Sequence, residues 1–580
     1  MECRFGHLHR SICINPFDTD NSKINRGSIM AALEIKNLSF SYPTQQDGEK
    51  ALDNISLSIA EGEFVLVCGP SGCGKSTLLR QIKPSLRPHG RSSGSVMLNG
   101  RSVNELSFRE QTEQIGFVLQ DPEMQLVTDK VWHELAFGLE SLGMENSKMR
   151  VRIAEIANYF GIQTYLDAST AELSGGQKQL ICLAGIMAMQ PELLLLDEPT
   201  SQLDPIAAGE FFSALKRINE ETGTTVVITE HRYENLFSIA DRVVFMENGR
   251  VIGNCSPRRA VSELSGKQDY VNILPAAMRL YAETASSTDN APITVREGRS
   301  YLRSIIGQKD ESDEIGKTNP QKEKREPILS VNDVWFRYER SGKDVLKGLS
   351  VDFFRGELSC VIGANGAGKT TAIMNAAGLY KPYRGKVRFD GKDIRTYKSS
   401  ELYGRRIALL VQNPACCFVK DTVREELESV RKHFELTGDR LDEVIELMEL
   451  APILDRHPYD ISGGELQRAA IARLLLPNPE IIFMDEATKG MDAFFKQRFG
   501  LLLKRLTANG TSIVMVSHDI EFCAEYADRC AMIFDGGITA EGSCREVLID
   551  NSFYTTAANR LSRGIVHSVL TVNELIDRVK

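Results

Sequence analysis

Short apolar runs recur in pairs along the chain, and the two members of each pair end in the same type of residue. EFVLVCG and ELSCVIG lead into glycine-rich loops, LLLLD and IIFMD end in an acid, and TTVVITEH and TSIVMVSH end in histidine. Apolar runs without alternation are typical of parallel strands that are buried on both faces. Helical patterns separate the runs, so the sequence predicts an α/β fold with polar side chains at the carboxyl ends of the strands.

The pairing extends through the whole chain as an internal duplication. Lys75 and Lys369 lie 294 positions apart in matching glycine-rich loops, and His231 and His518 lie 287 positions apart after matching runs. A period of this size predicts two copies of one domain, each of roughly 270 residues. The charged stretch between the copies ends in proline and is typical of a flexible linker. The predicted units are a disordered leader (1–29), a first domain (30–306), a linker (307–326) and a second domain (327–580).

Composition narrows the expected location and the class of partner. The net charge of −9 argues against a general nucleic-acid binder. The sequence has no run of about 18 apolar residues and no signal-peptide core at its N-terminus, so we expect a cytoplasmic protein. The 12 cysteines include no C-x-x-C pair, which favours reduced, mostly buried thiols over a zinc site or a disulfide framework. Met30 precedes the first predicted strand and is an alternative start of translation.

Each domain contains one match to the phosphate-loop pattern G-x-x-x-x-G-K-[ST]. Glycines let the backbone curl so that successive N–H groups point at a phosphate, and the following helix adds its positive end. The lysine neutralises the β- and γ-phosphates, and the next hydroxyl is a ligand for Mg²⁺. A chance glycine turn is a poor explanation for two matches that each follow a predicted strand. The predicted ATP-binding residues of these loops are Gly69, Pro70, Ser71, Gly72, Cys73, Gly74, Lys75, Ser76 and Thr77 in the first domain, and Gly363, Ala364, Asn365, Gly366, Ala367, Gly368, Lys369, Thr370 and Thr371 in the second.

A tyrosine precedes each phosphate loop, at Tyr42 and Tyr338. An aromatic ring at this point can stack on the adenine base of ATP. A tyrosine of the core or of a turn would satisfy the same pattern, so both interpretations stay open here.

Three further polar positions recur at the ends of predicted strands. The aspartate of each Asp-Glu pair is expected to hold Mg²⁺, and the glutamate to orient and polarise the attacking water. The histidine that ends the next strand is placed for a γ-phosphate contact, and the glutamine that ends IGFVLQ or IALLVQ can reach Mg²⁺ or the water. The predicted catalytic residues are Glu198, His231, Glu486, His518, Gln120 and Gln412, and the predicted Mg²⁺ ligands are Ser76, Gln120, Asp197, Thr370, Gln412 and Asp485.

Both copies also carry a serine and two glycines at the start of a helical run, LSGGQKQL and ISGGELQR. Alone, this pattern is only a helix-capping motif. Together with the phosphate loop, the glutamine, the Asp-Glu pair and the histidine, it resembles the nucleotide-binding domain of ABC ATPases, from about residue 32 onward. The resemblance implies tandem P-loop NTPase domains, each with a mainly parallel sheet core, an antiparallel β subdomain and a helical subdomain.

The resemblance further implies that the serine-glycine motif of one domain caps the ATP that is held by the other. Two domains packed head to tail would form two composite sites, and we expect both to hydrolyse ATP. Glu465 replaces the usual glutamine, and the loops 201–204 and 489–492 vary the usual S-A-L-D, so the two rates need not be equal. The predicted capping residues are Ser174, Gly175, Gly176, Ser462, Gly463 and Gly464.

The run DPEMQLVTDKVWHELAFGLE after Gln120 is similar to a segment of the ATPases of energy-coupling-factor importers, which take up cobalt or vitamins. The match includes Gln125, Trp132, Glu134 and Phe137. The corresponding segment of the second domain, QNPACCFVKDTVREEL, retains the spacing but differs at positions equivalent to Asp121 and Glu123. The resemblance implies a groove for a coupling helix of a polytopic membrane subunit, a separate substrate-binding membrane subunit, and a peripheral position on the cytoplasmic face of the plasma membrane. It does not indicate the transported substrate, and no nucleic-acid partner is expected.

The alternative is a tandem ABC ATPase that acts on ribosomes or nucleic acid. The prolines of the connecting region and the acidic balance of the chain count against it. The stretch TEHR at 229–232 differs from VSHD in the second domain, and the sequence alone offers no physical account of that difference.

Overall fold

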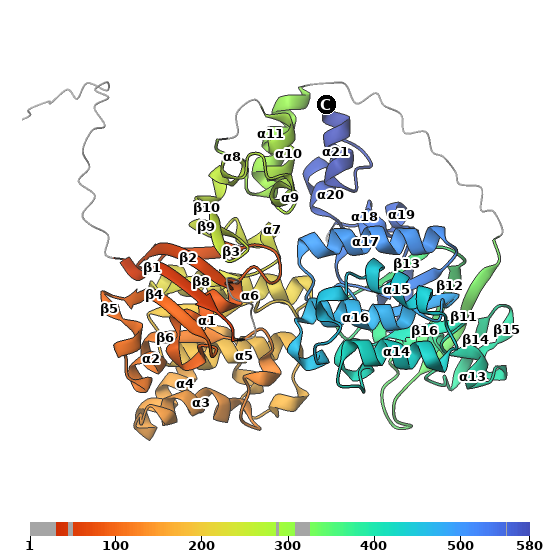
Figure 1. The fold of residues 1–580 in the computed structure, drawn as a ribbon, viewed down its shortest axis with the longest axis horizontal. Coiled ribbons are helices and arrows are strands. Elements are labelled where there is room, and N and C mark those ends of the chain that lie inside the picture. Colours follow the sequence, from red (N-terminus) through yellow and green to blue (C-terminus); the bar gives the residue numbers. More distant parts are fainter. Residues whose placement is uncertain (1–30, 44–49, 286–288, 308–324, 553) are drawn as a thin grey trace, which may run out of the picture.

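The computed structural model describes residues 31–43, 50–285, 289–307, 325–552 and 554–580. The predicted leader and nearly all of the predicted linker lie outside these residues. Figure 1 shows two halves of similar architecture side by side, each built from two sheets and a set of helices. The α/β fold with two tandem domains is thereby confirmed.

A six-stranded sheet forms the core of each half, and its strands are parallel except for one edge strand. Every residue of β3, β7 and β8 is buried, as their uninterrupted apolar sequences predicted. In spatial order the first sheet contains β10 (Arg250–Cys255), β9 (Arg242–Glu247), β3 (Phe64–Cys68), β8 (Thr225–Thr229), β7 (Leu193–Asp197) and β6 (Ile115–Val118). The second contains β16 (Ile407–Leu410), β17 (Ile481–Asp485), β18 (Ser512–Val516), β13 (Leu358–Ile362), β19 (Arg529–Phe534) and β20 (Gly537–Ser543).

A four-stranded antiparallel sheet packs beside each core and shares a hydrophobic cluster with it. Its strands alternate between buried and exposed positions, because one face meets the core and the other meets solvent. The strands are β2 (Leu52–Ala60), β1 (Ala31–Ser41), β4 (Arg91–Leu98) and β5 (Arg101–Ser102) in the first domain, and β12 (Leu346–Phe354), β11 (Pro327–Phe336), β14 (Arg384–Phe389) and β15 (Lys392–Asp393) in the second.

Helices complete each half, and one group of them forms the predicted helical subdomain. That subdomain contains α3 (Val131–Ser141), α4 (Asn146–Phe160) and α5 (Gly175–Ala188) in the first domain, and α14 (Val423–His433), α15 (Gly438–Leu447) and α16 (Gly463–Leu475) in the second. The other helices up to the C-terminal segments are α1 (Lys75–Ile82), α2 (Phe108–Gln114), α6 (Pro205–Thr222), α7 (Tyr233–Leu236), α8 (Ala260–Glu263), α9 (Gln268–Val271), α12 (Lys369–Ala376), α13 (Ser399–Leu402), α17 (Ala493–Ala508), α18 (Ile520–Tyr526) and α19 (Cys544–Leu548). The described helices include none with the length and hydrophobicity of a membrane span.

The last helices of the two domains pack on one another in a shared bundle (Figure 1). The bundle contains α10 (Ala276–Thr284), α11 (Val295–Ile306), α20 (Ala557–Ser562) and α21 (Val572–Val579). Thr294 caps α11 and Thr571 caps α21 in the same way, so the sequence repeat extends to the ends of both domains. The Arg299 guanidinium of the first domain donates to the carbonyls of Arg560, in α20, and Arg563, directly after it, in the second domain.

Candidate functional site

Both phosphate loops lie between a core strand and a helix, as their sequences predicted. The Lys75 ammonium donates to the carbonyls of Gly69 at 2.8 Å and Pro70 at 3.0 Å, and Lys369 makes the equivalent pair of bonds in the second domain. Gly74 has a φ of 101°, and a Cβ there would lie 2.5 Å from the carbonyl oxygen of Ala51. Only glycine permits this backbone without strain, so the loop places its N–H groups and its lysine around one small volume.

The glutamate that follows the acidic strand has an unusual backbone in both domains. Glu198 has a φ of 45° and Glu486 has a φ of 53°, a region that non-glycine residues seldom adopt. The backbone amide of each glutamate is held by the neighbouring strand, through the carbonyls of Thr229 and Val516 at 3.0 Å. Strain that recurs at equivalent positions is typical of functional sites, where a side chain must be aimed in a fixed direction.

The structure brings the predicted glutamine and histidine of the first domain onto this glutamate. Gln120 Nε2 donates to one carboxylate oxygen of Glu198 at 3.0 Å, and His231 Nε2 lies 2.8 Å from the other. Burial alone raises the pKa of Glu198, but the neighbouring His231 and Lys75 outweigh burial, and the pKa lies below its usual value. The first site therefore contains an ionised carboxylate that can orient a water molecule or accept a proton from it.

The second domain contains the same groups in a different arrangement. Gln412 Nε2 donates to Glu486 at 3.2 Å, whereas His518 faces Glu486 through Nδ1 at 3.6 Å. Lys489 adds a cation 3.7 Å from the same carboxylate. Burial raises the pKa of Glu486, but His518, Lys489 and Lys369 together hold it at about 2.

The aspartates before these glutamates fit a cation bound together with phosphate. Asp197 accepts the Ser76 hydroxyl at 2.7 Å, so two of the predicted Mg²⁺ ligands are in contact. Both carboxylate oxygens of Asp485 are buried without a hydrogen-bond partner, which is costly unless a cation satisfies them. In the described part of the chain no cluster of three or more His, Cys, Asp or Glu side chains could hold a metal. Mg²⁺ is usually bound by one or two carboxylates together with substrate phosphates, and its binding at these aspartates stays a prediction.

The two tyrosines contact the helix that starts in the phosphate loop. The Tyr42 hydroxyl lies 3.0 Å from Thr77 Oγ1, and the Tyr338 hydroxyl lies 2.9 Å from Thr371 Oγ1. The Tyr338 side chain is 62% exposed, so its ring face is accessible to a base. A stacking role for both tyrosines stays a prediction.

The serine-glycine motifs begin α5 and α16, and each serine caps its helix. Ser174 accepts the Gln177 amide, and Ser462 accepts the Glu465 amide in an equivalent capping box. Both serines are exposed, and the Ser462 hydroxyl donates to Glu465 at 2.8 Å. The predicted contact of each motif with the opposite phosphate loop stays a prediction.

Another residue of the second domain does reach the first phosphate loop. The Ser71 amide donates to the Asp492 carboxylate at 2.6 Å across the domain interface. Asp492 was not predicted as a site residue, although the loop that contains it, 489–492, stood out in the sequence. An aspartate directly before a helix predicts a helix cap, and Asp492 does cap α17 by accepting the Phe495 amide. This pattern gives no indication of the second contact with Ser71.

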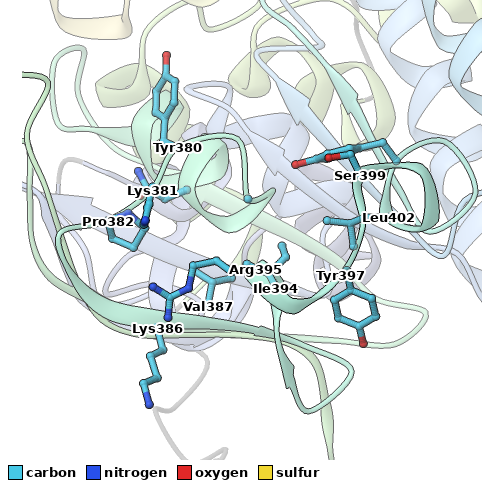
Figure 2. A pocket seen from close by; sticks show the side chains of 13 residues that line it. Tyr380, Lys381, Pro382, Lys386, Val387, Ile394, Arg395, Tyr397, Ser399 and Leu402 are labelled. Atoms are coloured by element: carbon cyan, nitrogen blue, oxygen red, sulfur yellow. The ribbon is translucent and has the colours of Figure 1, made fainter.

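A cavity of about 280 Å³ lies in the second domain, and Figure 2 shows side chains that line it. Asn375, Tyr380, Lys386 and Tyr403 are among its lining residues. The phosphate loop is at the start of α12, whereas Asn375 is near its other end. The cavity nevertheless adjoins the predicted ATP site, because Asn375 donates to the Thr371 carbonyl at 2.8 Å and the Tyr380 ring lies 5.9 Å from the Tyr338 ring.

Comparison with known proteins agrees with this geometry. The family model described as ABC transporter matches residues 52–201 and 346–489, which include both phosphate loops and both Asp-Glu pairs. The chain belongs to the ABC transporter ATPase family. As an ABC ATPase with two domains in one chain, it binds and hydrolyses ATP.

Relatives of similar length occur in bacteria and archaea. A candidate ABC transporter ATP-binding protein of Bacillus anthracis is 41% identical over 553 residues, which cover 95% of this ABC ATPase and 98% of the relative. One from Methanosarcina acetivorans is 33% identical over 535 residues, covering 89% and 86% of the two chains.

Two solved structures are similar to this chain over 42% and 88% of its length. cbiO1 of Clostridium perfringens, described as part of the ABC transporter complex cbiONQ, is 31% identical, covers 42% of this ABC ATPase and 93% of its own chain, and gives a TM-score of 0.37. The archaeal ribosome recycling factor aABCE1 covers 88% of this chain and 90% of its own with a TM-score of 0.56. Its identity of 20% shows a shared fold and no more.

Proposed function

We propose that this ATPase energises an importer of the energy-coupling-factor type, which takes up a vitamin or a transition-metal ion. The observation that carries the proposal is an exposed apolar surface on the segment after Gln120. The exposed fractions are 78% for Met124, 66% for Val127, 40% for Trp132 and 44% for Phe137. Exposed apolar side chains gathered on one segment are typical of a protein interaction site. The proposed occupant is a coupling helix of a polytopic membrane subunit.

Side-chain hydrogen bonds from Gln125 and Glu134 give the docking segment, residues 121–140, a defined shape. Glu134 accepts hydrogen bonds from the backbone amides of Val127 and Thr128, at 3.1 and 2.9 Å. Gln125 Oε1 accepts the Leu119 amide at 2.8 Å. The sequence resemblance at Gln125 and Glu134 therefore corresponds to residues that hold the segment, while Trp132 and Phe137 are available to a partner.

The docking segment is also tied to the helix that starts with the serine-glycine motif. Lys178 on α5 forms an ion pair with Glu123, and its side chain is only 10% exposed. Gln179 Nε2 donates to the Leu119 carbonyl at 3.1 Å. A displacement of α5 would therefore move the docking segment with it, which is the link that a transport ATPase needs.

In the proposed cycle, ATP draws the two domains together, because each serine-glycine motif meets a phosphate that is held by the opposite domain. The predicted ligands would be Ser76 and Asp197 for Mg²⁺ in the first site, and Thr370 and Asp485 in the second. Mg²⁺ would neutralise the charge that develops on the phosphates. Closure of the two domains would shift both helical subdomains and the coupling helices docked on them. Hydrolysis would let the domains separate again. Substrate choice is assigned to the separate membrane subunit.

The docking surface is tested by the variants Trp132→Ala and Phe137→Ala combined in one chain. We expect loss of co-purification with a polytopic membrane subunit and retained ATP binding. Phe108→Ala is the matched control, because Phe108 is 75% exposed on α2, outside the docking segment. Unchanged membrane co-purification in the double variant, or sedimentation with ribosomes, would contradict the proposal and favour the alternative of a ribosome-associated ATPase.

Energy coupling is tested with Lys75→Ala and Lys369→Ala together. Because both lysines are placed to neutralise phosphate charge, uptake should be abolished while the complex still assembles. Uptake that persists in this variant would exclude the role.

A further inference from the structure

The two histidine loops differ at the residue that follows the histidine. The first domain has Arg232 at this position and the second has Asp519. Asp519 acts within its own domain: it accepts the Phe522 amide at 3.1 Å as the cap of α18, and it pairs with Lys496 at 2.5 Å. This acidic cap is a common arrangement for a residue before a helix.

Arg232 acts in a different place. The helix that follows it, α7, begins without a side-chain cap. The Arg232 guanidinium donates to the carbonyl of Leu203, in the loop after the first Asp-Glu pair. The same nitrogen, Nη2, lies 3.5 Å from Nε2 of His518 in the second domain. Arg232 therefore spans the domain interface, and Asp519 makes no equivalent contact within the described residues.

The contact lies at the Nε2 side of the His518 ring. A guanidinium can only donate hydrogen bonds, so the contact favours a His518 ring with an unprotonated Nε2. Nδ1 lies on the side of Glu486, 3.6 Å from Oε1, and is buried without a hydrogen-bond partner. In the first domain the opposite nitrogen, Nε2 of His231, faces Glu198 at 2.8 Å. The two histidines thus present different nitrogens to their glutamates, and only His518 has a cation from the other domain beside it.

We propose that Arg232 is a positioning residue for the second ATP site, acting from the first domain. It holds the His518 ring with Nδ1 toward Glu486, and its bond to the Leu203 carbonyl links that orientation to the 201–204 loop of the first domain. Turnover at the second site then depends on a residue of the first histidine loop, whereas within the described residues Asp519 of the second histidine loop makes no such contact with His231. The inference rests on the proposed roles of Glu198, Glu486 and His518.

The test measures each site alone, in the variants Glu198→Gln and Glu486→Gln. Adding Arg232→Ala to Glu198→Gln, where only the second site turns over, should lower kcat about tenfold, a loss of about 1.4 kcal/mol of transition-state stabilisation. KM should change little, because Arg232 is not among the predicted ATP ligands. Adding Arg232→Ala to Glu486→Gln should leave kcat within about twofold. Arg232→Lys keeps a donor at this position and should restore part of the second-site kcat.

A merely structural role of Arg232 in its own histidine loop predicts the opposite pattern, a loss at the first site. That pattern, or an equal loss in both backgrounds, would overturn the proposal. Turnover that persists in the Glu198→Gln, Glu486→Gln double variant would instead show that the site assignment itself is wrong. Thermal unfolding of each variant verifies that the compared proteins are equally folded.

Discussion

The Ser71 amide and the Asp492 carboxylate, 421 positions apart, share a hydrogen bond of 2.6 Å that joins the first phosphate loop to the second domain. Asp492 also caps α17 by accepting the Phe495 amide. One carboxylate therefore links the start of a helix in one domain to the ATP-binding loop of the other. If a bound phosphate moves this loop, the Ser71–Asp492 hydrogen bond would transmit the movement to α17 of the second domain.

Asp492→Asn should weaken the coupling between ATP binding and domain closure. Asparagine caps helices as well as aspartate does, so α17 should keep its stability. Asparagine replaces a charge-assisted bond of about 1.5–3 kcal/mol by a neutral one of about 0.5–1.5 kcal/mol, a loss of about 1 kcal/mol, so we expect roughly a fivefold loss of first-site turnover. The measurement is kcat in the Glu486→Gln background. The comparison variant is Asp204→Asn, which makes the same change at the equivalent helix cap, that of α6 in the first domain. Equal kcat before and after the Asp492 change would contradict the coupling.

The Asp492 contact should also depend on pH in a defined direction. Burial raises the pKa of Asp492, but the amides of Phe495 and Ser71 outweigh burial and leave it below the ordinary value. A lowered carboxyl pKa contributes stability above the unfolded-state value of about 3.9, and this stability is lost as the pH falls through the folded-state pKa. The free energy of unfolding should therefore decrease less between pH 6 and pH 3 in Asp492→Asn than in the parent protein. An identical pH dependence in both proteins would show that the charge of the Asp492 carboxylate does not contribute to the free energy of unfolding.

Both ATP sites are expected to turn over. Glu198→Gln and Glu486→Gln should each leave part of the steady-state ATPase rate, because each removes the predicted water-orienting carboxylate from one site only. The double variant should lose at least about 100-fold. If one single variant leaves turnover intact and the other abolishes it, only one site is active.

Lys489→Ser should increase turnover at the second site. Lys489 lies 3.7 Å from Glu486 and is one of the cations that hold its pKa at about 2. Serine is the residue at the equivalent position of the first domain, Ser201. Removing the cation raises the pKa of Glu486 and makes it a stronger base, and we expect about a two- to threefold higher kcat in the Glu198→Gln background. The mirror variant, Ser201→Lys, should lower first-site turnover in the Glu486→Gln background. A fall in kcat on removing Lys489 would show that its cation assists the reaction instead.

Gly298→Val should destabilise the shared C-terminal bundle. A Cβ on Gly298 would lie 2.5 Å from Leu561 Cδ2 in the other domain and 2.7 Å from Ala277 Cβ. Overpacking of this kind costs about 1–3 kcal/mol, so the melting temperature should fall. The control is Gly209→Ala on α6, where no heavy atom lies within 4 Å of the added Cβ. That change should be neutral or slightly stabilising, because alanine favours a helix over glycine by about 0.5–1 kcal/mol. Equal melting temperatures of Gly298→Val and the parent would contradict this prediction, because they would show that close packing of α11 against α10 and α20 does not contribute to stability.

Most of the fold and of each half-site could be predicted from the sequence. The strand ends, the phosphate loops and the Asp-Glu pairs depend on local periodicity and on residues close in sequence. The convergence of Gln120 and His231 on Glu198 followed from one rule, that parallel strands present their carboxyl ends at one edge of a sheet. The strained backbone of that glutamate did not follow, because positive φ at a non-glycine residue leaves no sequence pattern.

By itself, the sequence determined that this protein has two copies of an ATP-binding domain and which side chains could serve each copy. Only the tertiary structure decided how the copies meet. It placed Asp492 against Ser71 and Arg232 against His518, and it made the two sites unequal. The physical reason is that such contacts depend on the relative orientation of two packed domains and on side-chain direction. Neither is encoded in the periodicity or spacing of a single segment.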